Sequence, residues 1–330
     1  MKKTLMLAGL LGTVATMAMA ADKPVLTVYA PDYFTSEWGP GPAIETGFEQ
    51  ICDCDLRFVA GDVLPRILLE GEKTEADVAI GLNTDVTARA RASGLFAPHN
   101  EDTSRLDLPV KWEDDTFLPF DWSETAFVYD KTKLKNPPKS FAELLDAPAD
   151  AYKIAIEDPR SSISGLALLL WVKAVYGDQS AEAWAKLAPK VLTVTQDWST
   201  AYGLFTDGEV DMVLSFTTSP AYHIIAEQDD TKAAAIFPEG HYLYTELVAQ
   251  LKTSKQPELA QKFMDYVLSD DFQGMIATAN WSYPVIMKPD FLPEGFATLP
   301  RPEKTLSFSE AEAEALRGPA LDEWRAAFRK

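Results

Sequence analysis

The sequence predicts an α/β protein in which mainly parallel strands are flanked by helices. Short runs rich in β-branched residues alternate with stretches of helical periodicity, and this βαβα order is typical of parallel sheets covered on both faces. The alternation occurs in two blocks, separated by a long extended segment without a helix of its own. With 330 residues, 47% of them hydrophobic and 24% charged, the chain is long enough for each block to bury its own core.

The individual elements follow from local patterns. Strands are expected where short apolar, β-branched runs occur, at Val25–Tyr29, Asp55–Val59, Ala76–Leu82, Tyr152–Ile156, Val191–Val194, Asp211–Ser215 and Ala233–Phe237. Helices are expected between them, at Ala43–Cys52, Leu64–Glu72, Thr84–Ser93, Phe141–Leu145, Gly165–Tyr176, Ala181–Ala188, Ser199–Asp207 and Ser219–Glu227. Near the C-terminus, the Glu/Ala-rich Ser309–Leu316 predicts a surface helix.

Two extended connections between the blocks predict a hinged molecule with two lobes. The segment Phe117–Tyr129 forms the first connection, and Tyr242–Leu251 returns before helical spacing resumes at Pro257–Leu268. We therefore assign residues 21–123 and 252–330 to lobe one, with C-terminal helices that both lobes can share, and residues 124–251 to lobe two. Open parallel sheets bind ligands beyond the carboxyl ends of their strands, so a ligand cleft is expected between the lobes.

The first 20 residues predict a secretory signal peptide. Lys2 and Lys3 precede an apolar run from Leu5 to Met17, and a small-residue cleavage site, Ala18–Ala20, follows it. The apolar run is shorter than the roughly 20 residues that span a bilayer. Because Ala21, and not a lipid-attachment cysteine, would begin the mature chain, we expect a protein that diffuses freely in the periplasm.

Charge and cysteine content exclude several classes of function. A formal charge of −20 opposes binding to a phosphate backbone, so no nucleic acid partner is expected. Cys52 and Cys54 are too few for a four-thiolate zinc or iron–sulfur site. Their one-residue spacing leaves open a structural disulfide or two free thiols, whereas redox catalysis would require the longer spacer of a C-x-x-C motif.

The turns that follow the expected strands carry acids beside aromatic residues. Asp32 precedes Tyr33, and Asp197 precedes Trp198 at a helix start. Aromatic faces attract cations, and a nearby carboxylate strengthens that preference, so the pattern favours a flat, positively charged ligand. By contrast, Trp171, Trp184, Phe205 and Phe263 lie at helical spacing among apolar residues and are assigned to the core.

Hydroxyl groups gather at two expected helix starts. Ser161 and Ser162 precede one helix, and Thr217, Thr218 and Ser219 precede another. Each cluster is explained by N-capping alone. Because both clusters are expected on loops at the cleft, they also suggest contact with a phosphate or another oxyanion. His223 is interpreted as a hydrogen-bonded, partly buried residue and not as a catalytic base.

Eight segments of the chain resemble one known family. They are Leu26–Tyr29, Trp38–Pro42, Ala126–Lys131, Lys135–Pro138, Asp158–Arg160, Ala201–Phe205, Thr217–His223 and Lys255–Phe263. In order and spacing they are similar to the periplasmic thiamine-binding proteins of bacterial ABC importers, and the closely spaced cysteine pair also looks like that of the family. The resemblance implies the two-lobed periplasmic binding protein fold, a thiamine ligand between the lobes, and delivery to a membrane permease.

Carried over residue by residue, the resemblance implies a set of ligand contacts. These are Gly61, Asp62, Ser162, Ile163, Trp198, Phe216, Thr217, Thr218, Ser219, Tyr222 and Trp281. The chain departs from the family pattern at two places: Phe216 stands where a tyrosine is expected, and the segment after Val59 and Ala60, which contains Gly61 and Asp62, is a few residues shorter. Trp198, Tyr222 and Trp281 are expected to enclose the thiamine rings, and Asp62 or Asp32 to face the cation.

The resemblance further implies that Ser162 and Thr217–Ser219 receive the hydroxyethyl or phosphate tail of thiamine or its mono- and diphosphate. It implies a monomer that carries no cofactor or metal and catalyses no reaction. Three alternatives are weighed against it. A ferric-ion binder would need paired tyrosines, which the sequence lacks; a polyamine binder would prefer spermidine to thiamine; and an exported hydrolase would turn over a thiamine ester.

Overall fold

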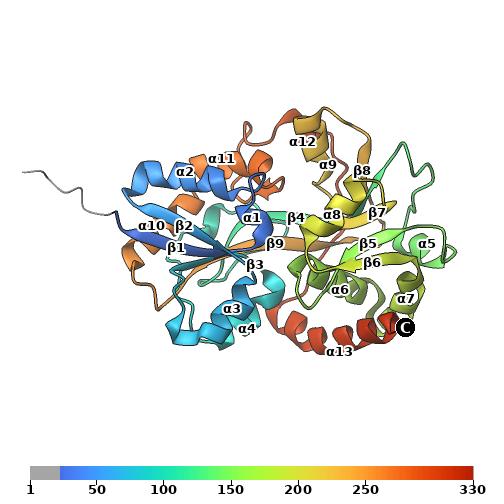
Figure 1. Cartoon of the computed structure of the whole chain (residues 1–330), viewed down its shortest axis with the longest axis horizontal. Coiled ribbons are helices and arrows are strands. Elements are labelled where there is room, and N and C mark those ends of the chain that lie inside the picture. The colour runs from blue at the N-terminus through green and yellow to red at the C-terminus, as the bar shows by residue number, and fades with distance from the viewer. Residues whose placement is uncertain (1–22, 330) are drawn as a thin grey trace, which may run out of the picture.

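The computed structural model describes residues 23–329, so the predicted signal peptide lies outside the described residues. A continuous sheet runs through the molecule in the order β2-β1-β3-β9-β4-β7-β5-β6 (Figure 1). Its strands are β1 (Val25–Ala30), β2 (Asp55–Ala60), β3 (Val78–Asn83), β4 (Leu118–Asp130), β5 (Ile154–Glu157), β6 (Val191–Thr195), β7 (Met212–Phe216) and β9 (His241–Gln250). Three short strands pair beside β4 and β9, namely β8 (Lys232–Ala235), β10 (Tyr283–Pro284) and β11 (Thr305–Leu306).

The pairing directions divide the sheet into two blocks. Strands β2, β1 and β3 are parallel to one another, as are β6, β5 and β7. Between them, β9 and β4 run antiparallel to each other and to their outer neighbours. The predicted α/β, two-lobed architecture is therefore confirmed, with the two long strands as the crossover connections. The predicted lobe boundaries at residues 123/124 and 251/252 remain a prediction.

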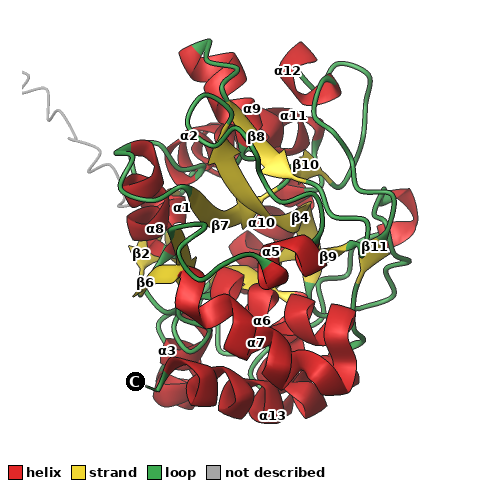
Figure 2. Cartoon of the chain, turned by 90° about the vertical axis from the view of Figure 1, so that its right-hand side faces the viewer, coloured by secondary structure: helices red, strands yellow, loops and turns green. Residues whose placement is uncertain are grey.

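Helices cover the sheet on both faces (Figures 1 and 2). They are α1 (Asp32–Thr35), α2 (Gly41–Cys52), α3 (Val63–Glu70), α4 (Thr87–Ala92), α5 (Phe141–Asp146), α6 (Ile163–Tyr176), α7 (Ser180–Leu187), α8 (Trp198–Thr206), α9 (Pro220–Tyr222), α10 (Pro257–Val267), α11 (Asp270–Ala279), α12 (Glu294–Ala297) and α13 (Glu310–Phe328). Within residues 23–329, none of these helices is both apolar enough and long enough to span a bilayer.

Two expected helices differ from the structure. The predicted helix Ser219–Glu227 is only the three-residue α9, followed by a π-helical turn, η6 (His223–Glu227). The predicted surface helix Ser309–Leu316 is the exposed beginning of the much longer α13, which contacts α4 in one block and α6 and α7 in the other. The later part of α13 buries Trp324, a contact that local charge patterning could not reveal. This helix therefore braces the two blocks.

The start of α6 is fixed firmly against the sheet. Most of α6 is buried, and Ser162 caps it by accepting a hydrogen bond from the Gly165 backbone at 3.3 Å. A Cβ on Gly165 would lie 2.6 Å from the carbonyl oxygen of Glu157, so only glycine allows this close approach to β5. The loop before α6 is consequently held in place at the carboxyl end of β5.

A disulfide joins Cys52 and Cys54 at the turn between α2 and β2. Their Cα atoms are 5.1 Å apart, and Asp53 between them adopts a left-handed conformation with φ of 52°. Both cysteines are buried against the core beneath β1. The pair therefore closes a local turn, at a distance from the loops that form the cleft.

Candidate functional site

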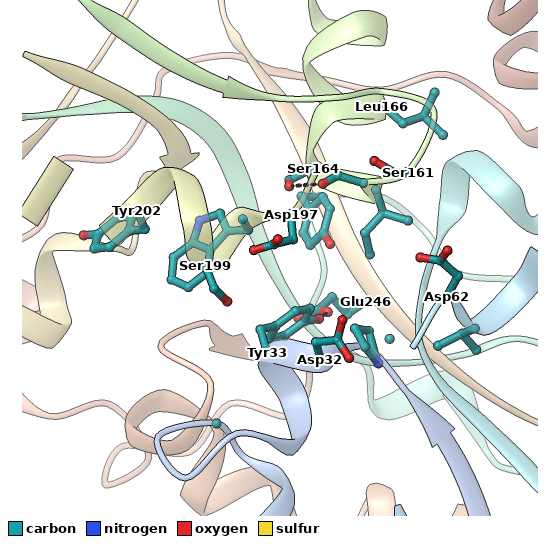
Figure 3. Close-up of a pocket in the computed structure, with 18 of the residues that line it drawn as sticks. Asp32, Tyr33, Asp62, Ser161, Ser164, Leu166, Asp197, Ser199, Tyr202 and Glu246 are labelled. Carbon is teal, nitrogen blue, oxygen red and sulfur yellow. Dashed lines mark hydrogen bonds between the residues drawn. The ribbon is translucent and has the colours of Figure 1, made fainter. Parts of the chain in front are cut away.

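A cavity of about 690 Å³ lies where loops from both blocks of the sheet meet. Its wall is formed by segments that follow β1, β2, β5, β6 and β7, together with the turn after α11. These are the carboxyl ends of the parallel strands, the place where open α/β sheets bind their ligands. Figure 3 shows side chains from these loops projecting into the cavity.

Most of the predicted site residues lie in the cavity wall. The structure brings together Asp32, Gly61, Asp62, Ser162, Ile163, Trp198, Phe216, Ser219, Tyr222 and Trp281. Thr217 and Thr218 are not part of the wall, and each is 1% exposed. Their hydroxyls bind the crossover strand instead, because Thr217 donates to Glu124 at 3.1 Å and Thr218 lies 3.0 Å from the Ser123 hydroxyl. The structure thus engages these two hydroxyls within the protein, and their contact with a ligand tail remains a prediction.

An aromatic wall forms one side of the cavity. Trp198 stacks on Tyr202, with ring centroids 4.7 Å apart, and its indole N–H donates to Ser215 at 2.9 Å. The i, i+4 spacing on α8 produces this stack. The Tyr202 hydroxyl lies 2.9 Å from Nε2 of His223, whose Nδ1 lies 2.7 Å from the Glu227 carboxylate.

The Glu227 carboxylate determines which groups donate in the hydrogen bonds between Tyr202, His223 and Glu227. Glu227 can only accept when ionised, so Nδ1 of His223 carries the proton and Nε2 accepts from Tyr202. His223 is 1% exposed with both ring nitrogens occupied, in agreement with its predicted structural role. Burial, and then the charge of Glu227, raises the pKa of Tyr202 far above its usual value, so the phenol stays a donor. Trp198 thus rests on a support chain of Tyr202, His223 and Glu227.

Two aromatic pairs meet across the cleft. Trp38, from the first block, lies 6.0 Å from Trp198, and Trp281, from the turn after α11, lies 5.2 Å from Tyr222 in an edge-to-face arrangement. Trp281 has a φ of 55°, a left-handed conformation that is unusual for a large side chain. The neighbouring Asn280 holds this turn in place.

Two buried carboxyl groups anchor Asn280 at the floor of the cavity. Asp121 of β4 and Glu246 of β9 are paired in register, and the Asn280 amide donates to them at 2.5 and 2.7 Å respectively. The Tyr33 hydroxyl also donates to Glu246. Burial raises the pKa of both carboxyl groups, and the charge of Glu246 adds to the increase at Asp121. Ionising both of two adjacent buried carboxyl groups is energetically unfavourable, so the pair retains a proton.

Sequence reasoning missed the floor and one end of the cavity. Glu246 is a lone acid within a fully buried strand, a pattern that could have marked it as functional. Tyr202 could have been found from its helical spacing to Trp198. Arg89 of α4 and Arg317 of α13 also line the cavity, and no local motif points to them.

A possible metal cluster occurs near the aromatic wall. Within residues 23–329, one set of three metal-binding side chains approaches closely enough, with ligand atoms of His223, Glu227 and Asp229 within 4.8 Å of one another. Because both ring nitrogens of His223 are already hydrogen-bonded, the cluster lacks a free nitrogen ligand. Its geometry is explained by the support of Tyr202.

Comparisons with known proteins agree with this architecture. The model of the bacterial extracellular solute-binding protein family matches residues 52–294. The chain is 49% identical over 309 residues to the thiamine-binding periplasmic protein of Escherichia coli K12, covering 92% of this chain and 94% of the relative. It is 48% identical over 317 residues to the protein of the same name from Brucella abortus, with coverage of 95% and 94%. The chain therefore belongs to the bacterial extracellular solute-binding proteins.

Solved structures extend the comparison. A periplasmic thiamin binding protein superposes with a TM-score of 0.91 at 48% identity, covering 98% of this chain and 100% of the other. Iron-bound HitA from Pseudomonas aeruginosa superposes with a TM-score of 0.76 at 21% identity, covering 93% and 100%. The second similarity is one of fold alone. Proteins with this fold thus bind different solutes, and the side chains in the cleft determine which solute is bound.

Proposed function

We propose that this protein is the periplasmic solute-binding component of an ABC importer, and that it binds thiamine and its phosphate esters in the cleft. The observation that carries the proposal is the composition of the wall. Trp198, Tyr222 and Trp281 offer flat faces, while the carboxylates of Asp32 and Asp62 line the same cavity. The sequence identity to relatives named as thiamine-binding supports the same ligand.

The chemistry of thiamine matches these groups. Its thiazolium is permanently cationic and its aminopyrimidine is aromatic, so both rings can stack on an indole or phenol. Cation–π contacts contribute about 0.5–2 kcal/mol each, depending on desolvation. Because Trp198 is already stacked on Tyr202 and bonded to Ser215, little side-chain entropy is lost when a ring packs against it.

Binding couples to closure of the two lobes. The cross-cleft pairs Trp38–Trp198 and Tyr222–Trp281 bring residues of both blocks together around the cavity. A ligand that contacts both rims favours the closed arrangement by its differential affinity. The closed form then presents both lobes to a membrane permease as a monomer, without any reaction on the solute.

Calorimetric titration of the mature chain, residues 21–330, tests the proposal. Thiamine should bind with 1:1 stoichiometry, whereas spermidine and Fe(III) should give no saturable heat. Thiamine monophosphate incubated with the protein should release no phosphate. Saturable binding of spermidine or Fe(III) without binding of thiamine would contradict the assignment, and turnover of the ester would assign the protein to the enzymes.

A further inference from the structure

One end of the cavity carries positive charge. Arg89 and Arg317, which we call the arginine pair, line it from α4 and α13, and the α6 start, with Ser162 and Ser164, lines the same cavity. Helix α13 contacts α4, α6 and the short 3-10 helix η2 (Thr84–Val86), so these elements meet on one side. Figure 3 places Leu166 and Asp62 on the opposite side of the cavity from Tyr202, with Ser164 between them. Helix α8, which carries Trp198 and Tyr202, packs on β5, β6 and β7, whereas α4 and α13 pack against η2, so different groups of elements carry the aromatic wall and the arginine pair.

The arginine pair differs from the other arginines around it. Arg160 also lines the cavity, but its guanidinium is occupied by a bidentate contact with Asp158. Arg91, on the same helix as Arg89, is paired with Asp114 and Glu310. In the described part of the chain, no ion pair or hydrogen bond engages either guanidinium of the arginine pair. Within residues 23–329, two arginines thus line the ligand cleft without a direct ion-pair partner.

The nearest buried acid does not neutralise this charge. Asp85 of η2 is 3% exposed and accepts hydrogen bonds from Tyr242 at 2.7 Å and from Asn83 at 3.1 Å. Burial raises its pKa to about 7, although the charge of Arg317 acts in the opposite direction. Burial, and then the charge of Arg89, lowers the pKa of Arg317. The charges of Glu314 and Asp85 act on Arg317 in the opposite direction without reversing this decrease. An anion placed between the two guanidinium groups would therefore be stabilised.

We propose that the arginine pair binds the terminal phosphate of thiamine diphosphate, so that the cleft prefers phosphorylated thiamine to the free vitamin. The inference rests on the proposed function and names the preferred substrate class of the same site. Thiamine diphosphate carries its cationic rings at one end and its anionic tail at the other. The cleft has the complementary arrangement, with aromatic groups at one end and the arginine pair at the other.

Titration of two glutamine variants with thiamine, its monophosphate and its diphosphate tests this inference. Arg317→Gln and Arg89→Gln should each raise the Kd for the diphosphate at least tenfold and change the Kd for thiamine less than twofold, because hydrogen bonds to charged groups are the strong ones. Arg317→Lys, which keeps the charge but not the planar fork, should lose less affinity than Arg317→Gln. Arg325→Gln is the matched control, because Arg325 lies on the same helix but outside the cavity wall.

The outcomes separate this inference from the proposed function. If the wild type binds thiamine and diphosphate equally, or if both glutamine variants leave diphosphate binding unchanged, the function stands and the arginine pair is not the phosphate site. Equal weakening of all three ligands also contradicts the inference, since it indicates a structural role. If the wild type binds none of the three ligands, the proposed function itself fails. Should Arg317→Gln not fold, the exposed Arg89 supplies the test.

Discussion

The two ends of the cleft are built on different principles. At the aromatic wall, each polar atom behind Trp198 is satisfied, through Ser215 on one side and the Tyr202, His223 and Glu227 chain on the other. At the arginine pair, two guanidinium groups line the cavity, and neither has an ion-pair or hydrogen-bond partner within residues 23–329. The first end is therefore organised before a ligand arrives, while the second gains its electrostatic partner from the ligand. Shape selection and charge selection are thus separated in space.

The largest expected effect concerns the buried acid behind the arginine pair. The folded pKa of Asp85, about 7, is above the value near 3.9 of an unfolded aspartate, so the folded state retains the proton over this interval. Stability from this group consequently falls as pH rises from about 4 to 7. Asp85→Asn removes this pH-dependent loss of stability, because an amide does not ionise. The new amide N–H₂ can donate to Asn83 Oδ1, which lacks a partner in the described chain, if the Asn83 amide rotates.

Urea unfolding at pH 4.5 and pH 8 measures the contribution of Asp85 protonation to the free energy of unfolding. The stability difference between Asp85→Asn and the wild type should shift in favour of the variant by on the order of 3 kcal/mol between the two pH values. An equal difference at both pH values would show that Asp85 is ionised throughout. In that case it would neutralise Arg317, and the contrast between the two ends would disappear.

Removal of the aromatic wall should weaken every form of the ligand alike. Stacking on one aromatic side chain contributes about 1–3 kcal/mol, so Trp198→Ala should raise the Kd for thiamine and both esters by about tenfold to a hundredfold. Trp198→Phe, which keeps a ring but loses the bond to Ser215, is the control and should lose less. Calorimetry that showed a selective loss of the diphosphate would place the phosphate, not the rings, at this wall.

A smaller effect is expected from the support chain. Tyr202→Phe keeps the stack beneath Trp198 but removes the hydroxyl that donates to His223, so thiamine affinity should fall about two- to fivefold. A double-mutant cycle identifies the cause, because the same substitution should have no effect when residue 198 is already alanine. An unchanged loss in that background would mean that Tyr202 acts independently of Trp198.

The smallest expected effect is kinetic and has opposite signs for two ligands. The formal charge of −20 attracts the thiamine cation and repels the anionic diphosphate at long range. Raising the salt concentration should therefore slow association of thiamine and accelerate association of the diphosphate, each by about two- to threefold. Stopped-flow fluorescence of the cleft tryptophans can follow both rates, and a shift of the same sign for both ligands would exclude steering by net charge.

The sequence predicted those parts of the site that lie next to a recognisable element. Trp198 and Asp62 were expected at the cleft because each follows a strand, and the alternating elements revealed both blocks of the sheet. The orientation of Thr217 and Thr218 could not be predicted, because a turn after a strand can direct its hydroxyls into the cleft or back to the neighbouring strand, as it does here. Glu246 and Arg317 were missed because a crossover strand and a distant helix supply them, and only the tertiary fold brings them to the cavity.

A crystal structure with bound thiamine diphosphate would test the central claim most directly. The claim predicts that the ring system packs against Trp198, near Trp281, and that the terminal phosphate lies within hydrogen-bond distance of Arg89 and Arg317. Density for the diphosphate at the aromatic wall, or for the rings outside the cleft, would contradict the division of the site into a ring-binding end and a charge-binding end.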